Sequence, residues 1–331
     1  MSRRFDIYAI GNALVDLEYA VDEAFLNQHG IEKGVMTLAE ADSQASLLSA
    51  LDANAPRLKQ ASGGSAANSI IAASAMGARC FYHCKVANDA LGTLYRDDLL
   101  AADVSTNLGE IRPDGVTGTC VVMVTPDTDR TMNTYLGITA EVSHAELDPE
   151  ALQDSKWLYI EGYLCTSDSA RDAVAHAHEL ARAAGVKRAL TFSDPAMVQY
   201  FLPQLKTLLA DGVDLLFCNE DEARGFAGCD DLNQALTVLR GVAERGIITC
   251  GKNGAWVWTQ TSVLELPACP ATPVDTLGAG DSFAGAVLYG LSQGWKLEDC
   301  ARLAMRTAAQ VVSQFGPRLS IEQYRALLSA D

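Results

Sequence analysis

Positive charge is scarce in this sequence: 25 Lys and Arg residues stand against 42 Asp and Glu, a formal net charge of −17 at pH 7. A protein that binds a phosphate backbone or an anionic lipid surface needs a concentrated basic surface. The composition therefore argues against nucleic-acid and membrane-surface functions. No stretch approaches the roughly 18 apolar residues of a membrane span. Asp6 interrupts the first apolar stretch before a signal-peptide core forms.

Paired cysteines are also missing, because the nine cysteines are scattered and form no CxxC motif. Most lie inside apolar runs, which is typical of buried thiols in a reducing compartment rather than of a disulfide framework. Cys80, His83 and Cys84 form the tightest cluster, and alternation along a short strand explains their spacing as well as a metal site does. We favour the strand and expect a cytoplasmic protein.

A regular alternation of elements begins at about residue 155. About half of the 331 residues are hydrophobic (49%), enough for a sizeable core. Short β-branched or aromatic runs alternate with helical patterns, which predicts βαβ units in a parallel sheet covered on both faces. We expect strands at 157–162, 188–193, 213–218 and 246–250, and helices at 169–184, 198–210 (weakened by Pro203) and 231–244. The N-terminal part starts likewise, with a strand at 7–10, a helix at 69–76 and a strand at 80–86.

Two stretches, about 13–40 and 109–140, interrupt this alternation. Both are rich in β-formers and turn residues and lack helical periodicity. They can contribute strands to a small second sheet that covers one edge of the main domain. No linker or internal repeat separates them from the rest. We therefore predict one α/β domain over residues 1–331, a doubly wound, mostly parallel sheet carrying an inserted β lid.

The most informative segment is DTLGAGD (275–281), which opens a helical run at 282–291. A glycine-rich turn at a helix start presents unpaired N–H groups and the positive end of the helix dipole, an arrangement that binds anions, most often phosphate. The segment is neither a Walker A loop nor GxGxxG. A carboxylate at Asp281 is stabilised there and is a weak base, which phosphoryl transfer tolerates. The alternative, a residue that only complements the dipole, stays open on spacing alone.

This segment resembles the C-terminal signature of the ribokinase-like (PfkB) family of sugar and nucleoside kinases. The resemblance implies that Asp281 is the catalytic base and that the amides of Gly278, Ala279 and Gly280 form an anion hole for the transferred phosphoryl group. It also implies the three-layer ribokinase-like fold and the use of ATP and magnesium. Many members respond to a monovalent cation such as potassium near this loop, and the sequence leaves that dependence open.

A second segment, SGGSAAN (62–68), resembles the N-terminal Gly-Gly signature of the family. The paired glycines, Gly63 and Gly64, let the backbone approach a ligand or absorb a hinge rotation. Asn68 can point its amide at a sugar hydroxyl. A hydrolase nucleophile elbow is the rival interpretation, but the final glycine of that motif is absent.

The N-terminal segment GNALVD (11–16) places polar and apolar side chains on one face. If the chain is extended, Asn12, Leu14 and Asp16 point to the same side. Such a face suits a ligand with a hydroxylated and an apolar part. Asp16 can accept hydrogen bonds from both hydroxyls of a ribose diol. The alternative is a turn-forming aspartate at a strand end.

Two further segments resemble the nucleotide side of the family's site. Asn219 and Glu222 form a capping-box pattern and also match the family's NxxE motif, which organises magnesium and nucleotide phosphates largely through water. Both interpretations can hold together. TCGKNG (249–254) resembles the turn along which ATP lies, with a plain hairpin turn as the alternative. The residues assigned to ATP in it are Thr249, Gly251, Lys252 and Gly254.

Arg130 lies in a polar turn of the expected lid, from which it can reach over the active site. There it would neutralise charge developing on the transferred phosphate. Without the family resemblance it would be an ordinary surface arginine.

Within the family the resemblance is closest to the adenosine kinases, over residues 11–40, 117–120, 158–163 and 213–227. It implies a purine pocket lined by Leu14, Leu38 and Tyr163, and a ribose held by Asn12, Asp16, Gly64 and Asn68. The expected reaction is ATP-dependent phosphorylation of a ribonucleoside 5′-hydroxyl, with adenosine to AMP as the first candidate. Inosine, guanosine or a free sugar such as ribose or fructose stays open, as does a monomer or a homodimer. A non-catalytic nucleoside-binding regulator is the rival class, against which the intact Asp281 argues.

Overall fold

A nine-stranded sheet forms the centre of the computed structural model, which describes residues 3–127 and 129–329. Its strand order is β14-β13-β12-β11-β10-β9-β1-β5-β6, and neighbours from β12 to β6 are parallel. The antiparallel β13 and β14 extend one edge. The strands are β1 (Phe5–Ile10), β5 (Cys80–His83), β6 (Val104–Thr106), β9 (Ser155–Glu161), β10 (Lys187–Thr191), β11 (Leu215–Asn219), β12 (Gly246–Thr249), β13 (Ala255–Trp258) and β14 (Val263–Leu266).

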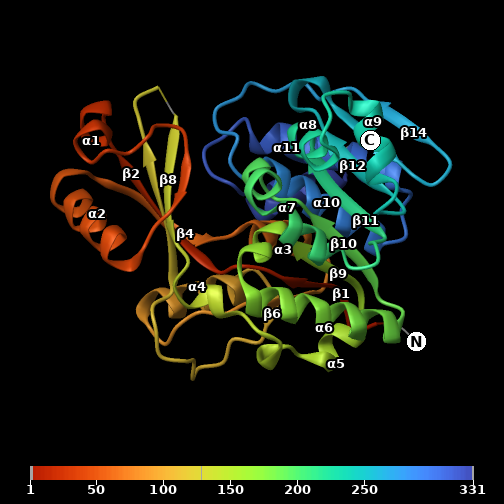
Figure 1. The fold of residues 1–331 in the computed structure, drawn as a ribbon, viewed down its shortest axis with the longest axis horizontal. Helices are drawn as coiled ribbons and strands as arrows, with labels where there is room; N and C mark the ends of the chain where they lie inside the picture. Colours follow the sequence, from red (N-terminus) through yellow and green to blue (C-terminus); the bar gives the residue numbers. More distant parts are fainter. Residues whose placement is uncertain (1–2, 128, 330–331) are drawn as a thin grey trace.

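Helices cover both faces of this large sheet and give three layers (Figure 1). All six residues of β1 are buried, with Ile7 and Ala9 in one core cluster and Tyr8 and Ile10 in the other. Strands buried on both faces read as continuous apolar runs, which is why the sequence located them. One face packs α3 (Ser65–Ala75), α4 (Ala90–Ala101), α10 (Ala279–Ser292), α11 (Leu297–Val311) and α12 (Ile321–Leu328). The other packs α5 (Pro149–Gln153), α6 (Asp168–Ala184), α7 (Pro195–Leu209), α8 (Glu220–Ala227) and α9 (Leu232–Leu239).

A small five-stranded sheet stands to one side of the large sheet, at the left of Figure 1. Its order is β3-β8-β7-β2-β4, and it carries α1 (Glu23–Gln28) and α2 (Ala41–Asn54). The strands are β2 (Leu14–Ala20), β3 (Met36–Leu38), β4 (Arg57–Gly63), β7 (Gly118–Val124) and β8 (Arg130–Tyr135). Four of them come from the two stretches that interrupt the alternation. The fifth, β4, was not predicted, because its first four residues are exposed and show no apolar pattern.

Some element boundaries differ from the expectation. The helix expected at 231–244 ends at Leu239, and the helix expected from residue 69 begins at Ser65. In α7 the backbone of Phe201 leaves helical geometry two residues before Pro203, as expected from the ring of a proline inside a helix. Helices α1, α2, α4, α5, α11 and α12 were not predicted, and α1 lies in the stretch 13–40, which was expected to form strands without a helix.

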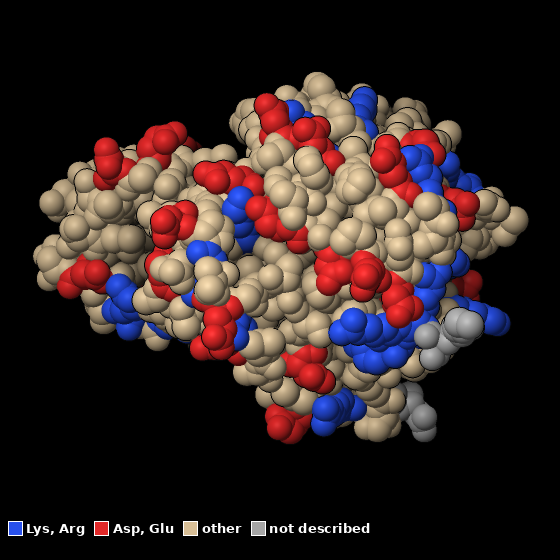
Figure 2. Space-filling view, turned by 90° about the horizontal axis from the view of Figure 1, so that it is seen from below, with Lys and Arg blue, Asp and Glu red and all other residues tan. Residues whose placement is uncertain are grey.

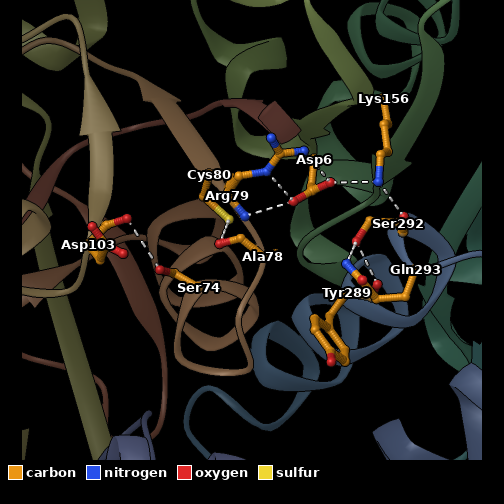
Figure 3. A network of polar contacts seen from close by, with 10 residues as sticks. All are labelled: Asp6, Ser74, Ala78, Arg79, Cys80, Asp103, Lys156, Tyr289, Ser292 and Gln293. Atoms are coloured by element: carbon orange, nitrogen blue, oxygen red, sulfur yellow. Dashed lines mark hydrogen bonds and ion pairs between the residues drawn. The ribbon is translucent and has the colours of Figure 1, made fainter. Parts of the chain in front are cut away.

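Basic side chains at the amino ends of the parallel strands hold buried acids and helix ends. Asp6 is 3% exposed and accepts a hydrogen bond from the backbone nitrogen of Arg79 at 2.9 Å. Its carboxylate also forms an ion pair with Lys156 at 2.7 Å (Figure 3). Lys156 also donates to the carbonyl of Ser292 at the end of α10. Figure 2 shows Lys and Arg gathered mainly at the right of the face that it draws, with Asp and Glu spread over that face. The carboxyl ends of the parallel strands lie at the opposite edge of the large sheet, where the chain enters α3 and the small sheet.

None of the described helices combines the length and the apolar character that crossing a membrane requires.

Candidate active site

A cavity of about 670 Å³ lies between the large and the small sheet. Its walls come from residues after the carboxyl ends of β1, β9 and β10, from the N-terminal turns of α3 and α10, and from the small sheet. In open α/β sheets ligands bind outside the carboxyl ends of the strands. Of the residues expected from the sequence, those that line it are Asn12, Leu14, Asp16, Leu38, Gly64, Asn68, Arg130, Tyr163, Gly278, Gly280 and Asp281. Those outside its lining are Gly63, Asn219, Glu222, Thr249, Gly251, Lys252, Gly254 and Ala279.

Asp281 lies in the first turn of α10, and two side chains of α3 hold its carboxylate. Ser65 Oγ donates to Oδ1 at 2.6 Å, and Asn68 Nδ2 donates to Oδ2 at 2.9 Å. Burial raises the pKa of Asp281, while these two hydrogen bonds and the charge of Arg318 oppose the rise. The helix start was expected to keep this group a weak base; burial outweighs that effect, so the carboxylate is a stronger base than expected.

The turn before α10 depends on a glycine. Gly278 has φ +72°, and a Cβ on it would lie 2.4 Å from the Pro317 carbonyl oxygen. No described side chain caps the N-terminus of α10, and the first N–H groups of a helix have no partner inside it. A Cβ on Gly280 would meet open space, so there is room beside these donors. The turn fits an anion such as a phosphate.

Asn12, Leu14 and Asp16 face the cavity together, whereas Ala13 and Val15 are fully buried. The alternation expected for this segment is confirmed. Burial raises the pKa of Asp16 to about 7; the charge of Arg318 opposes this and that of Asp281 adds to it.

The two glycines of the Gly-Gly signature make room for their neighbours. A Cβ on Gly63 would lie 2.3 Å from the carboxylate oxygens of Asp16. Gly64 has φ +99°, and its Cβ would lie 2.4 Å from the Asn12 carbonyl oxygen. The glycines therefore allow Asp16 and Asn12 to occupy their places.

Glu161, at the end of β9, is a cavity residue that the sequence analysis missed. It is fully buried, and its two oxygens accept hydrogen bonds from the backbone nitrogens of Asn12 (2.6 Å) and Ala66 (2.9 Å). Burial raises its pKa to about 7. It ties the segment after β1 to the start of α3, across separations of 149 and 95 residues that no local pattern reveals.

Arg130 begins β8 and reaches from the small sheet to the turn before α10. Its Nη2 lies 2.7 Å from Asp275 Oδ2, and its Nη1 lies 3.5 Å from Glu18. Asp275 also accepts from the backbone nitrogens of Leu277 and Gly316. Arg130 thus bridges the two walls of the cavity beside the anion-binding turn.

The capping box at the start of α8 is confirmed. Glu222 accepts from the backbone nitrogen of Asn219 at 2.9 Å and from its Nδ2 at 3.0 Å, and the Glu222 nitrogen donates back at 2.8 Å. Glu222 is 4% exposed, and burial raises its pKa to about 7, with the charge of Asp194 adding to the rise. Asp194 itself lines the cavity and lies 3.4 Å from the Tyr163 hydroxyl.

Residues 249–254 form the hairpin connection between β12 and the antiparallel β13. The turn contains one short 3₁₀ segment, Gly251–Asn253. Gly254 has φ +96°, and a Cβ on it would lie 1.9 Å from the Leu266 carbonyl oxygen. The hairpin alternative accounts for the glycines here.

The small sheet and its ends line the cavity with polar residues, among them Asp16, Arg130 and Thr134, and with apolar residues. Leu14 and Leu38 are among the apolar residues, as expected, and the sequence analysis missed the other apolar ones. The apolar residues that the small sheet and its ends add are Met36, Cys120, Met132 and Leu136. The cavity therefore combines a polar part, which includes Asp281 and Asp16, with an apolar part formed by these leucine, methionine and cysteine side chains.

The donor set fits a magnesium–nucleotide pair rather than a metal held by protein alone. Over residues 3–127 and 129–329, no three His, Cys, Asp or Glu residues are grouped to hold a metal ion. Magnesium keeps several waters and needs one or two carboxylates besides substrate phosphates. Asp194 lines the cavity, and its charge helps to raise the pKa of Glu222, which lies outside the lining.

Comparisons with known proteins identify the family to which this fold belongs. An adenosine kinase structure from Sinorhizobium meliloti is 33% identical, with a TM-score of 0.89, and the match covers 98% of this chain and 100% of that one. A probable sugar kinase from Rhizobium etli is 32% identical, with a TM-score of 0.88 and coverage of 98% and 99%. The adenosine kinase of Schizophyllum commune is 28% identical over 95% of this chain and 96% of its own. The model of the pfkB family of carbohydrate kinases matches residues 35–323. The chain belongs to this family and is a phosphotransferase that acts on a hydroxyl group.

Proposed function

We propose that the protein transfers the γ-phosphoryl group of ATP to the 5′-hydroxyl of a ribonucleoside, with adenosine as the first candidate. The observation that carries the proposal is a cavity that combines polar side chains, among them Asp281 and Asp16, with the apolar side chains of Leu14, Leu38 and their neighbours. A nucleoside has one hydroxylated part and one apolar, aromatic part, and can contact both sets of side chains. A free sugar would leave the apolar side chains without a partner.

The residues that line the cavity have separate roles in this reaction. Asp281 takes the proton of the attacking hydroxyl, and its raised pKa favours that role at neutral pH. The amides of residues 278–281 stabilise the transferred phosphoryl group. Asp16 accepts from the ribose diol, with Asn12, Gly64 and Asn68 beside it. Leu14, Leu38 and Tyr163 contact the base.

The nucleotide lies on the side of Asp194, Glu222 and the hairpin at 249–254. Asp194 and Glu222 would hold a magnesium ion that comes with the nucleotide, and the ion would supply positive charge against the phosphates. Glu222 acts through water, because both of its oxygens already accept from Asn219. Arg130 neutralises charge at the phosphoryl group after leaving Asp275. Closure of the small sheet over the cavity excludes water and suppresses ATP hydrolysis.

The relatives favour a nucleoside but span several acceptors. Adenosine kinases of Sinorhizobium meliloti and Schizophyllum commune match over nearly the whole chain. A mouse ribokinase is 29% identical over 78% of this chain, and a cytidine kinase of Thermococcus kodakarensis is 40% identical over 31% of it. Inosine, guanosine, cytidine and free ribose are therefore the competing acceptors.

The test is ADP release from magnesium-ATP with adenosine, inosine, guanosine, cytidine, 2′-deoxyadenosine, ribose and fructose. We expect selective turnover of adenosine and loss of kcat by several orders of magnitude in Asp281→Asn, with nucleoside binding retained. Asp299→Asn is the matched control, because Asp299 is an exposed aspartate in the first turn of another helix, α11. Turnover of free sugars alone would refute the nucleoside proposal. Near wild-type kcat in Asp281→Asn would remove that residue from the base role.

A further inference from the structure

Arg318 lies between α11 and α12, and neither the sequence motifs nor the proposed reaction uses it. Its Nε donates to Asn68 Oδ1 at 2.8 Å, and its Nη2 donates to the Ser62 carbonyl at 2.6 Å. Its Nη1 lies 3.2 Å from Asp98 Oδ2. The side chain is 17% exposed, and Arg318 is outside the lining of the cavity. Any effect of Arg318 on a substrate therefore passes through the residues that it holds.

The contact with Asn68 matters because the two ends of an amide are chemically opposite. The Oδ1 end accepts a hydrogen bond from Arg318, and the Nδ2 end donates one to Asp281. A rotated amide would place an acceptor against the Asp281 carboxylate and a donor against the guanidinium, so that each charged group would lose its hydrogen bond to Asn68. Arg318 and Asp281 thus fix one orientation of the Asn68 side-chain amide. The second N–H of Nδ2 remains for the cavity, which Asn68 lines.

On the basis of the proposed function, we propose that Arg318 is a positioning residue for phosphoryl transfer. It fixes the Asn68 amide, Asn68 in turn holds the Asp281 carboxylate, and the guanidinium offsets the negative charge gathered around that carboxylate. Arg318 also donates a hydrogen bond to the Ser62 carbonyl near the end of β4, immediately before Gly63 and Gly64, where the chain leaves the small sheet.

The charges around Asp281 show why the positive charge of the Arg318 guanidinium matters. The other carboxyl groups facing it are Asp16 from β2 and Glu161 from β9, whose pKa values its charge helps to raise. The phenol groups facing it are Tyr159, Tyr163 and Tyr324. Arg318 lowers the pKa of both Asp281 and Asp16 against these influences. Removal of the guanidinium should therefore raise the pKa of Asp281 further.

The kinetic test compares Arg318→Met and Arg318→Lys with a matched control, Asp98→Asn. The control removes the carboxylate paired with Nη1 but leaves the Nε contact to Asn68. With whichever acceptor the wild-type protein phosphorylates, we expect Arg318→Met to lower kcat by about tenfold or more, the loss of one hydrogen bond in a charged network. The acid limb of its kcat–pH profile should move to higher pH. Arg318→Lys should restore the pH limb but not the full kcat, because an ammonium lacks the planar fork of donors. Asp98→Asn should resemble wild type in both.

A double variant separates positioning from general stability. If Arg318 acts through Asn68, Arg318→Met should change kcat little in an Asn68→Ala background, whereas a purely structural role would add its full effect there. Thermal unfolding of each variant shows whether it is folded. If Arg318→Met does not fold, Arg318→Lys alone carries the kcat and pH comparison.

A readout without catalysis keeps this inference separate from the proposed function. The side-chain amide signals of Asn68, assigned by their loss in Asn68→Ala, should titrate with Asp281 in an NMR pH series of the protein alone. The midpoint should move to higher pH in Arg318→Met. An unchanged midpoint with wild-type kcat in a folded variant would overturn the positioning role. Absence of turnover with every acceptor would refute the proposed function, while the NMR series would still decide the role of Arg318.

Discussion

Replacement of Asp16 by asparagine should make the protein more stable at pH 8 and less able to bind its acceptor. Burial, with the nearby charge of Asp281, raises the pKa of this carboxyl from 3.8 to about 7. A carboxyl with a raised pKa stabilises the fold only when it is protonated. Its contribution is complete below about pH 4 and is lost as the pH rises through about 7. At pH 8 the folded protein therefore holds a charge that the unfolded chain would keep in water.

The size of the effect follows from the two pKa values. A rise from 3.8 to about 7 corresponds to roughly 4 kcal/mol, at about 1.4 kcal/mol for each pKa unit. The Asp16 side chain is only partly buried in the open cavity, and solvent screens part of this cost. We expect a gain of about 1–2 kcal/mol in the free energy of unfolding for Asp16→Asn at pH 8, with a smaller gain at pH 5.

Urea unfolding at pH 5, 6.5 and 8 measures this gain directly. Asp114→Asn is the matched control, because it removes one negative charge from an exposed loop position of the same acidic chain. Acceptor affinity should fall in Asp16→Asn, since an amide presents one acceptor oxygen where the carboxylate presents two. A gain that is equal at all three pH values would refute the electrostatic reasoning, as would no gain at pH 8.

Three other changes test separate parts of the structure. Asp6→Asn should lower the free energy of unfolding by about 1–2 kcal/mol at neutral pH, because it removes the buried carboxylate that pairs with the partly exposed Arg79 and Lys156. The pKa of Asp6 is lowered to about 2, so its contribution to stability is complete above about pH 4 and is lost as the pH falls through about 2. Urea unfolding should therefore show a smaller difference in the free energy of unfolding between variant and wild type at pH 2 than at pH 7. Gly278→Ala should abolish most turnover and lower Tm, since its Cβ would meet the Pro317 carbonyl oxygen at 2.4 Å; Gly294→Ala, with φ +83° and open space around its Cβ, has the same backbone strain without the collision and should keep kcat. Leu14→Ala should raise KM for a nucleoside about tenfold or more while changing KM for ribose little, in steady-state assays of both acceptors. Equal changes for the two acceptors would contradict the placement of the base against the apolar side chains.

The parts of the fold that the sequence predicted are those whose burial leaves a local pattern. β9, β11 and β12 contain apolar runs between helical segments, because these strands are covered on both faces. β4 escaped detection because it is an exposed edge strand with polar residues. α2 was missed although Leu47 and Leu51 are buried on it. A half-buried element leaves a weaker pattern than a strand covered on both faces.

The candidate site divides in the same way. Asn12, Leu14 and Asp16 could be placed on one face from alternation alone, and Asp281 from the helix that follows its glycines. Glu161 and Arg318 could not. Their partners lie 149 and 250 residues away, and nothing in the neighbouring sequence distinguishes them from ordinary charged residues.

The order of strands in the small sheet has a consequence for how the chain is synthesised. Its two excursions from the large sheet, residues 14–63 and 118–135, interleave, because β7 inserts beside β2 and β8 inserts beside β3. A nascent chain that ends before residue 118 has β2 paired only with β4, and its other edge presents free backbone donors and acceptors. The sheet is completed only after β8 has left the ribosome, and the wall of the cavity with it. Truncated products of this chain should therefore be prone to aggregation. Chaperones that bind open strand edges should act before β8 has been synthesised.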